Sequence, residues 1–117
     1  MHKFKELGIW HKSRLFCSKI YNETASFPSE EKFGLTNQLR RASVSIPSNI
    51  AEGSSRSSNK EFVRFLEIAI GSAYEVETQL LISVDLGFLT PEIAKELCDL
   101  LEEIIKMTSK FRSTLKT

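Results

Sequence analysis

The residues with the greatest potential for binding chemistry cluster between positions 40 and 56. Two adjacent arginines begin this stretch, a third arginine ends it, and a proline, an asparagine and a glutamate lie between them. Guanidinium and amide groups donate hydrogen bonds to phosphate or carboxylate oxygens, so the stretch could form a binding face at one end of a helical protein. Together with nearby basic residues, the candidate contacts for a nucleic acid or a protein partner are Arg14, Arg40, Arg41, Asn49, Glu52, Arg56, Lys60 and Arg64.

The same stretch also has a purely structural interpretation. Pro47 falls inside an apolar pattern typical of a helix, where a proline removes one amide donor and clashes with the carbonyl of Ser43. We expect a kink there, with the hydroxyls of Ser43 or Ser45 replacing part of the lost hydrogen bonding. Glu52 would then pair with an arginine. The sequence leaves the structural and the binding interpretations open.

Catalytic chemistry has little support in the sequence. The only histidines are His2 and His11, and neither follows a glutamate at the Glu-x-x-His spacing of di-metal helical bundles. No glycine-rich phosphate loop is present, and no histidine is well placed to activate a serine. Cys17 and Cys98 fit no metal or disulfide spacing and are expected to be reduced core thiols. We therefore predict no catalytic, cofactor-binding or metal-binding residues, and a protein that is not an enzyme.

The composition predicts one globular domain covering residues 1–117. Hydrophobic residues make up 41% of the chain and charged residues 26%, and no apolar run is long enough for a signal peptide or a membrane span. We therefore expect a cytoplasmic protein without a membrane partner. The net charge is +1, but residues 1–66 carry about +5 and the remainder about −4. This polarity could steer an anionic partner, or it could reflect helix complementarity within a bundle or an oligomer.

Four helices are predicted from the apolar spacing and the terminal signals. The expected ranges are about 7–26, 30–52, 59–86 and 91–113. Ser29 is the expected N-cap of the second helix, and Gly53 its left-handed stop. Ser58 with Glu61 forms a capping box, and Thr90 precedes a proline at the first position of the last helix.

Short connections between these helices predict an all-α, antiparallel up-down-up-down four-helix bundle. The third helix carries a second apolar row beside its main stripe. This row could face another helix of the same chain or another subunit, and consists of Val63, Ile70, Tyr74 and Leu81.

Several motifs resemble a known family. They are Phe4-x-Glu-Leu-x-Ile-Trp10, Phe27-Pro28, Gly34-Leu-x-x-Gln-Leu-Arg-Arg-Ala42, Ser45-Ile-Pro-Ser-Asn-Ile-Ala-Glu-Gly53 and Phe65-Leu-x-Ile-Ala-x-Gly-Ser-Ala-x-Glu-x-Glu77. Together they resemble the four-helix-bundle proteins encoded in 23S rRNA intervening sequences, a family that includes the accessory variability determinant Avd of diversity-generating retroelements. The chain departs from the motif at Ile70, where an arginine is expected.

The resemblance implies a barrel-like homopentamer of four-helix bundles with a capacity for nucleic-acid binding. For Avd-type members it also implies association with a reverse transcriptase. Gly71 and Ala73 fit a close approach between helices.

Two functions follow as hypotheses. The first is a non-enzymatic oligomer that binds nucleic acid, such as structured RNA, through a basic face. The alternative is a protein-interaction scaffold that docks on a partner such as a reverse transcriptase. The second hypothesis needs an exposed apolar or mixed patch, for which Trp10, Phe16 and Phe88 are the candidates.

Overall fold

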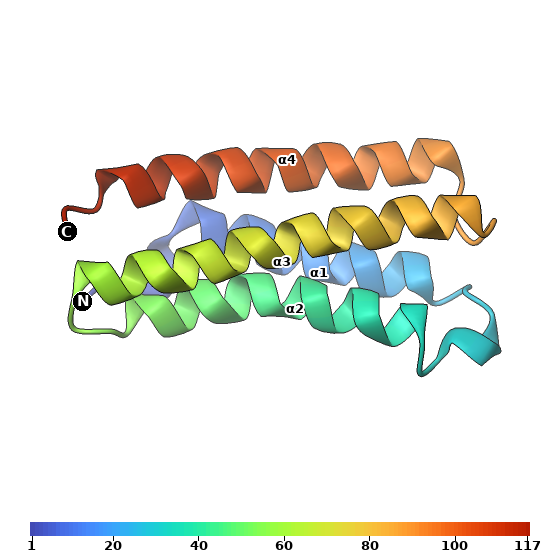
Figure 1. The fold of residues 1–117 in the computed structure, drawn as a ribbon, viewed down its shortest axis with the longest axis horizontal. Helices are drawn as coiled ribbons and strands as arrows, with labels where there is room; N and C mark the ends of the chain where they lie inside the picture. The colour runs from blue at the N-terminus through green and yellow to red at the C-terminus, as the bar shows by residue number, and fades with distance from the viewer.

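The computed structural model describes all 117 residues and contains helices and turns but no strand. The helices are α1 (Gly8–Thr24), α2 (Leu35–Ser54), α3 (Asn59–Asp85) and α4 (Pro91–Thr114), with 3₁₀ turns η1 (Phe4–Glu6) and η2 (Ser29–Glu31). Successive helices alternate in direction and form an elongated bundle of 44 × 24 × 19 Å (Figure 1). The predicted all-α four-helix bundle is confirmed.

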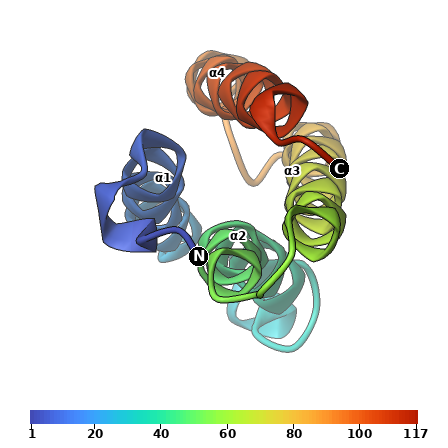
Figure 2. The ribbon, with the colours of Figure 1, turned by 90° about the vertical axis from the view of Figure 1, so that its left-hand side faces the viewer.

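The two ends of the bundle differ in what they contain. Both chain termini and the α2–α3 connection lie at one end, which we call the terminal end (Figure 1). The α1–α2 and α3–α4 connections lie at the opposite end, which we call the corner end. Seen along the axis, the helices follow one another around the bundle in chain order (Figure 2).

The core is a single cluster of 19 buried apolar residues contributed by all four helices and the segments beside them. Its largest fully buried side chains include Phe16 from α1, Leu39 from α2, Phe62 from α3 and Leu101 from α4. The burial of these side chains is the main source of stability, because each fully buried large apolar side chain contributes about 1.5–3 kcal/mol. No helix is both long and apolar enough to cross a membrane.

The ends of α3 and α4 follow the sequence signals closely. The Ser58 hydroxyl accepts a hydrogen bond from the amide of Glu61 at 3.2 Å, and the Thr90 hydroxyl accepts one from Ile93 at 3.2 Å. Gly87, which follows α3, has a φ of +77°, a conformation that favours glycine. The predicted capping roles of Ser58 and Thr90 are confirmed.

The start of α2 was predicted wrongly. The chain forms a separate 3₁₀ turn at 29–31, and α2 begins only at Leu35. The Ser29 hydroxyl donates to the side chain of Glu30 and does not cap α2. Instead, the carboxylate of Glu31 accepts a hydrogen bond from the Leu35 amide at 3.0 Å, which places a negative charge at the positive end of the helix.

Gly53 is not the left-handed stop that was expected. α2 continues to Ser54, and Gly87 is the only residue with a positive φ. Gly53 is buried, and an added Cβ would lie 2.6 Å from the Cβ of Phe65 on α3. Its role is therefore to let α2 and α3 approach closely just before they join.

Pro47 has no amide hydrogen, so the carbonyl of Ser43 lacks its usual helical partner. A side chain from the neighbouring helix α1 donates a hydrogen bond to this carbonyl instead. The thiol of Cys17 on α1 donates a hydrogen bond to the Ser43 carbonyl, with 3.1 Å between Sγ and O. The Ser43 hydroxyl bonds instead to the Arg40 carbonyl, so the predicted replacement by Ser43 is wrong. Burial raises the pKa of the Cys17 thiol, which keeps its proton available for this bond at neutral pH.

This arrangement predicts a coupling between Cys17 and Pro47. Cys17→Val keeps an apolar side chain but removes the donor, and should lower the free energy of unfolding by about 1–2 kcal/mol, since a buried carbonyl loses its partner. In a Pro47→Ala background the restored amide can bond to Ser43, so the same change should cost much less. Urea unfolding of the four proteins in this double-mutant cycle measures the difference. An equal cost in both backgrounds would contradict the role of the thiol.

Burial of the same thiol predicts a dependence of stability on alkaline pH. Because the folded-state pKa of Cys17 is raised, the unfolded chain ionises first above the ordinary thiol pKa of about 8.5. The contribution of the buried thiol to stability is therefore complete below that pH and is lost as the pH rises further.

Candidate nucleic-acid interface

The eight candidate contacts do not form one continuous face. They divide into residues whose side chains already have hydrogen-bond or ion-pair partners in the chain and residues that are exposed without an ion pair. The first group contains Arg40, Asn49, Glu52 and Arg56. The second group contains Arg14, Arg41, Lys60 and Arg64.

Arg40 binds the C-terminal turn of α1. Its Nε donates to the Thr24 hydroxyl at 2.9 Å and its Nη2 to the Tyr21 carbonyl at 3.3 Å. The guanidinium also lies 4.5 Å from the centre of the Tyr21 ring. The last carbonyls of a helix lack intrahelical partners and favour a cation, so Arg40 acts as a cap that ties α2 to α1.

Asn49 forms part of the seam between α2 and α3. Its side-chain amide donates to the carbonyl and the hydroxyl of Ser45, at 2.8 and 2.9 Å. That hydroxyl is in turn 2.9 Å from the hydroxyl of Ser72 on α3. The polar groups of this part of the motif are therefore engaged with one another.

Glu52 and Arg56 form an ion pair one helical turn apart. Arg56 Nη2 lies 3.2 Å from Glu52 Oε1, and the guanidinium lies 4.8 Å from the centre of the Phe65 ring. Both side chains are partly exposed, so the pair itself contributes at most about 1 kcal/mol. Arg56 belongs to the terminal end, beside the start of α3.

Among the four exposed candidates, two are neighbours and two are isolated. Lys60 and Arg64 lie one turn apart at the start of α3, where they border a shallow depression that also includes the C-terminal Thr117. Arg14 lies on α1 with its guanidinium 5.3 Å from the centre of the Trp10 ring. Arg41 lies in the half of α2 nearer the corner end and contributes to no shared surface with Lys60 and Arg64.

A different feature emerges when the charges are placed on the antiparallel bundle. The half at the terminal end comprises residues 1–15, 46–70 and 103–117, and contains 11 Lys/Arg against 5 Asp/Glu, a net charge of +6. The half at the corner end contains 5 Lys/Arg against 10 Asp/Glu, a net charge of −5. The overall charge of +1 therefore conceals a strong separation along the long axis.

The basic terminal end is built from three chain segments that contact each other. The backbone amide of His2 donates to the Ser54 carbonyl at 3.1 Å, and the His2 ring packs 5.0 Å from Phe62 and 5.8 Å from Phe111. Asn59 at the start of α3 donates to the carbonyl of Lys116 at 3.1 Å. The basic residues of this half are Lys3, Lys5, Lys12, Arg14, Arg56, Lys60, Arg64, Lys106, Lys110, Arg112 and Lys116.

Most residues of this surface were not among the contacts predicted from the sequence. Of its basic residues, only Arg14, Arg56, Lys60 and Arg64 had been predicted as contacts. The charges had been compared between the first and second halves of the sequence, whereas each end of the bundle contains residues from both halves. The predicted helix boundaries were sufficient to find this surface. Placing the charged residues on four antiparallel helices assigns most basic residues to one end of the bundle and most acidic residues to the other.

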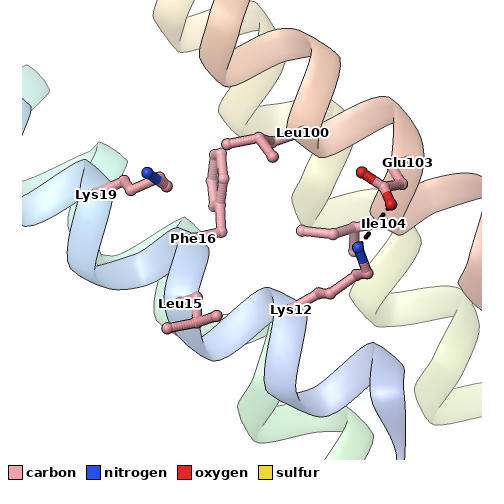
Figure 3. A pocket seen from close by; sticks show the side chains of 7 residues that line it. All are labelled: Lys12, Leu15, Phe16, Lys19, Leu100, Glu103 and Ile104. Carbon is pink, nitrogen blue, oxygen red and sulfur yellow. Dashed lines mark hydrogen bonds and ion pairs between the residues drawn. The ribbon is translucent and has the colours of Figure 1, made fainter.

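A small groove between α1 and α4 is a separate feature of the surface (Figure 3). It holds about 130 Å³ and has an apolar floor formed by Phe16, Leu100 and Ile104. The ion pair between Lys12 Nζ and Glu103 Oε1, 2.6 Å apart, bridges the two helices at its edge (Figure 3). The groove is smaller than the roughly 300 Å³ of a typical small-molecule site.

The structure also locates the residues proposed for an apolar docking patch. Phe16 is buried in the core, and Trp10 and Phe88 are half-buried against it. Phe88 packs on Phe27 with 5.5 Å between ring centres, and Trp10 packs on Phe4 at 5.0 Å. None of the three forms an exposed patch, so these candidates were wrong. No group of three or more His, Cys, Asp or Glu residues is placed to hold a metal ion.

The fold and charges thus define a small antiparallel helical bundle with one basic and one acidic end. Residues 5–110 match the family described as 23S rRNA-intervening sequence protein, and the chain belongs to this family. The predicted resemblance to that family is confirmed.

A solved structure supports the same assignment. It is a protein of unknown function from the S23 ribosomal protein family of Bacteroides thetaiotaomicron VPI-5482, which superposes with a TM-score of 0.79 at 25% identity. The alignment covers 89% of this chain and 97% of that protein. A search of curated proteins found no match.

Proposed function

We propose that this protein is a non-enzymatic, self-associating bundle that binds the phosphates of structured RNA through its terminal end. The observation that carries the proposal is the separation of charge into +6 at that end and −5 at the other. Nucleic-acid affinity is largely electrostatic, so a concentrated basic surface matters more than the charge of the whole chain. The acidic end would be repelled, and a nucleic acid would therefore meet the bundle in one orientation.

The family supports RNA as the first ligand to test. Its name refers to intervening sequences of 23S rRNA, and ribosomal RNA offers helical regions with closely spaced phosphates. Binding to such RNA would place the protein in the cytoplasm. DNA is the second ligand to compare with it.

Self-association is supported by apolar side chains that the chain itself leaves uncovered. In the second row of α3, Tyr74 and Leu81 are each 54% exposed, while Val63 and Ile70 are half-buried. Another copy would cover part of this row and would repeat the basic end, which multiplies the phosphate contacts available to one RNA. A ring of five copies, as the family resemblance implies, would gather five such ends on one rim.

A second candidate function is docking on a different protein, such as a reverse transcriptase. The same exposed residues of α3 favour it, because uncovered apolar surface serves any protein partner. Self-association that covers Tyr74 and Leu81 would leave this candidate without its surface.

The salt dependence of RNA binding tests the proposal. We expect fluorescence anisotropy with a labelled RNA hairpin to show binding at about 50 mM salt, with log K falling linearly as log salt rises. Light scattering on the same samples should give a mass well above the monomer mass of 13.3 kDa. Absence of binding at low salt, or affinity that does not change with salt, would contradict the RNA part. A monomer at all concentrations would contradict self-association.

A further inference from the structure

An open hollow at the terminal end lies between the N-terminal segment and the end of α2. It has a volume of about 410 Å³, within the range of roughly 300–1,000 Å³ of small-molecule sites. Figure 2 shows the N-terminal segment reaching from α1 to α2. The residues of the lining that matter for binding are Lys3, Phe4, Lys5, Glu6, Ser54 and Ser55.

The backbone on the N-terminal side of the hollow is held by hydrogen bonds. The amide of His2 donates to the Ser54 carbonyl at 3.1 Å, and that of Glu6 donates to the Lys3 carbonyl at 3.0 Å. The carbonyl oxygen of Lys5 lies 2.6 Å from His11 Nε2. This side of the hollow is therefore ordered before any ligand arrives, so little conformational freedom would be lost on binding.

Phe4 gives the hollow an aromatic wall. Its ring meets the ring of Trp10 in an edge contact, with 5.0 Å between the ring centres and an angle of 67° between the planes. Phe4 is half-buried, so Trp10 fixes the ring while part of it stays open toward the hollow. Nucleobases stack on such aromatic side chains whatever their sequence, because every base has a flat π face.

The charges beside the aromatic wall are mainly positive. Lys3 and Lys5 line the hollow, and Lys5 Nζ lies 6.0 Å from the centre of the Phe4 ring. Glu6 is the one acidic residue of the lining, and residues 1–15 contain four Lys/Arg against this single acid. An aromatic face beside lysines fits a nucleobase with its phosphate. A purely apolar ligand would not use the lysines, and a free phosphate would not use the ring.

The end of α2 supplies polar groups on the opposite side. The Ser54 hydroxyl donates to the Ala51 carbonyl at 2.6 Å, and the Ser55 hydroxyl donates to the Glu52 carbonyl at 2.7 Å. A hydroxyl that donates its proton still has lone pairs to accept a hydrogen bond. Because Ser55 is exposed, its oxygen can accept from an amino group on the edge of a base.

We propose that this hollow holds one unpaired nucleobase of the bound RNA, stacked on Phe4, with the adjoining phosphate against Lys3 and Lys5. The inference rests on the RNA binding proposed above and adds a requirement for bases outside a duplex. Paired bases are already stacked on one another, whereas the bases of loops and bulges can turn outward onto an aromatic ring. The remaining basic residues of the terminal end would contact phosphates of the flanking helix.

The first experiment compares two RNAs with equal numbers of phosphates. One is a hairpin with an unpaired loop, and the other is a blunt duplex without unpaired bases. Wild-type protein should bind the hairpin about tenfold more tightly, since that is the usual effect of stacking one base on an aromatic side chain. In Phe4→Leu the two affinities should become roughly equal, while the salt dependence should persist because the lysines remain.

A matched control removes an aromatic ring from the other end of the bundle. Phe33 is 86% exposed and lies in the α1–α2 connection at the corner end. Phe33→Leu should keep the preference of the wild type for the hairpin. Urea unfolding establishes that both variants are folded.

The second experiment locates the base on the wild-type protein and so does not depend on a variant. The hairpin carries 5-iodouridine in its loop, and irradiation joins this base to an aromatic ring in contact with it. The carbon–iodine bond breaks, a carbon–carbon bond forms, and hydrogen iodide leaves. Mass spectrometry of the digested product should place the cross-link on Phe4.

The outcomes separate this inference from the function on which it rests. Equal wild-type affinities for hairpin and duplex, with a steep salt dependence, would overturn the stacking and leave phosphate binding in place. A hairpin preference that Phe4→Leu retains, or a cross-link at the corner end, would also overturn it. Tighter binding of a DNA hairpin of the same sequence would overturn the assignment to RNA. No binding of either RNA at low salt would contradict both the inference and the proposed function.

Discussion

Replacing Gly53 with alanine is expected to lower the free energy of unfolding by about 1–3 kcal/mol, the usual cost of adding a methyl group to a filled interior. The added Cβ would lie 2.6 Å from Phe65 Cβ and 2.9 Å from Phe62 Cδ1, closer than real Cβ atoms pack. The Cβ of Phe65 is fixed to the backbone of α3 and cannot rotate away. The two helices would have to separate at the point where they join.

Gly71 provides the matched control for this substitution. It lies on α3 in an exposed position, and an added Cβ would meet nothing within 4 Å. No other helix of the same chain approaches Gly71, whereas Ala73 is buried in the core. Gly71→Ala should be neutral or stabilise the protein by up to about 1 kcal/mol, because alanine favours a helix over glycine. Urea unfolding of both variants at equal concentration measures the contrast, and equal effects would refute the packing role of Gly53.

Neutralising basic side chains at the terminal end is expected to weaken RNA binding strongly. The variant Lys60→Gln with Arg64→Gln and Lys116→Gln removes three charges from exposed residues near the α2–α3 connection and the C-terminus. For each phosphate that these side chains no longer neutralise, the affinity should fall roughly tenfold at about 0.1 M salt, and the salt slope should decrease by about 1.

A second triple variant changes the net charge equally without touching the terminal end. Lys19→Gln, Arg41→Gln and Lys95→Gln remove three charges from the half at the corner end. The proposed interface predicts a small effect on RNA affinity and slope for this variant. Equal losses in the two variants would show that only net charge matters and that the terminal end has no special role.

Helix positions were predictable where local chemistry determines them. The Ser58 and Thr90 caps and the apolar stripes of α2, α3 and α4 depend on residues a few positions apart, and these signals were interpreted correctly. Errors arose where a distant residue decides the outcome. Gly53 resembles a helix stop in sequence, but the rings of Phe62 and Phe65 on another helix explain it.

For the candidate binding residues, too, the sequence does not show which side chains are already occupied by distant parts of the chain. Arg40 and Asn49 have the side chains of a binding motif, but Thr24, Tyr21 and Ser45 already occupy their donors. Only the folded chain shows that the Cys17 thiol replaces the donor removed by Pro47. The motif from 40 to 53 therefore specifies how α2 joins its neighbours, and the basic surface is formed by residues outside it that the fold brings together.

Amine reactivity with and without RNA provides the most direct test of the terminal-end interface. Acetylation of lysines, followed by mass spectrometry, reports each side chain separately. The account predicts that RNA slows modification of Lys3, Lys5, Lys60, Lys110 and Lys116 at the terminal end, and leaves Lys19, Lys32 and Lys95 of the other half unchanged. Protection centred on Lys19, Lys32 and Lys95, or spread evenly over both halves, would contradict it.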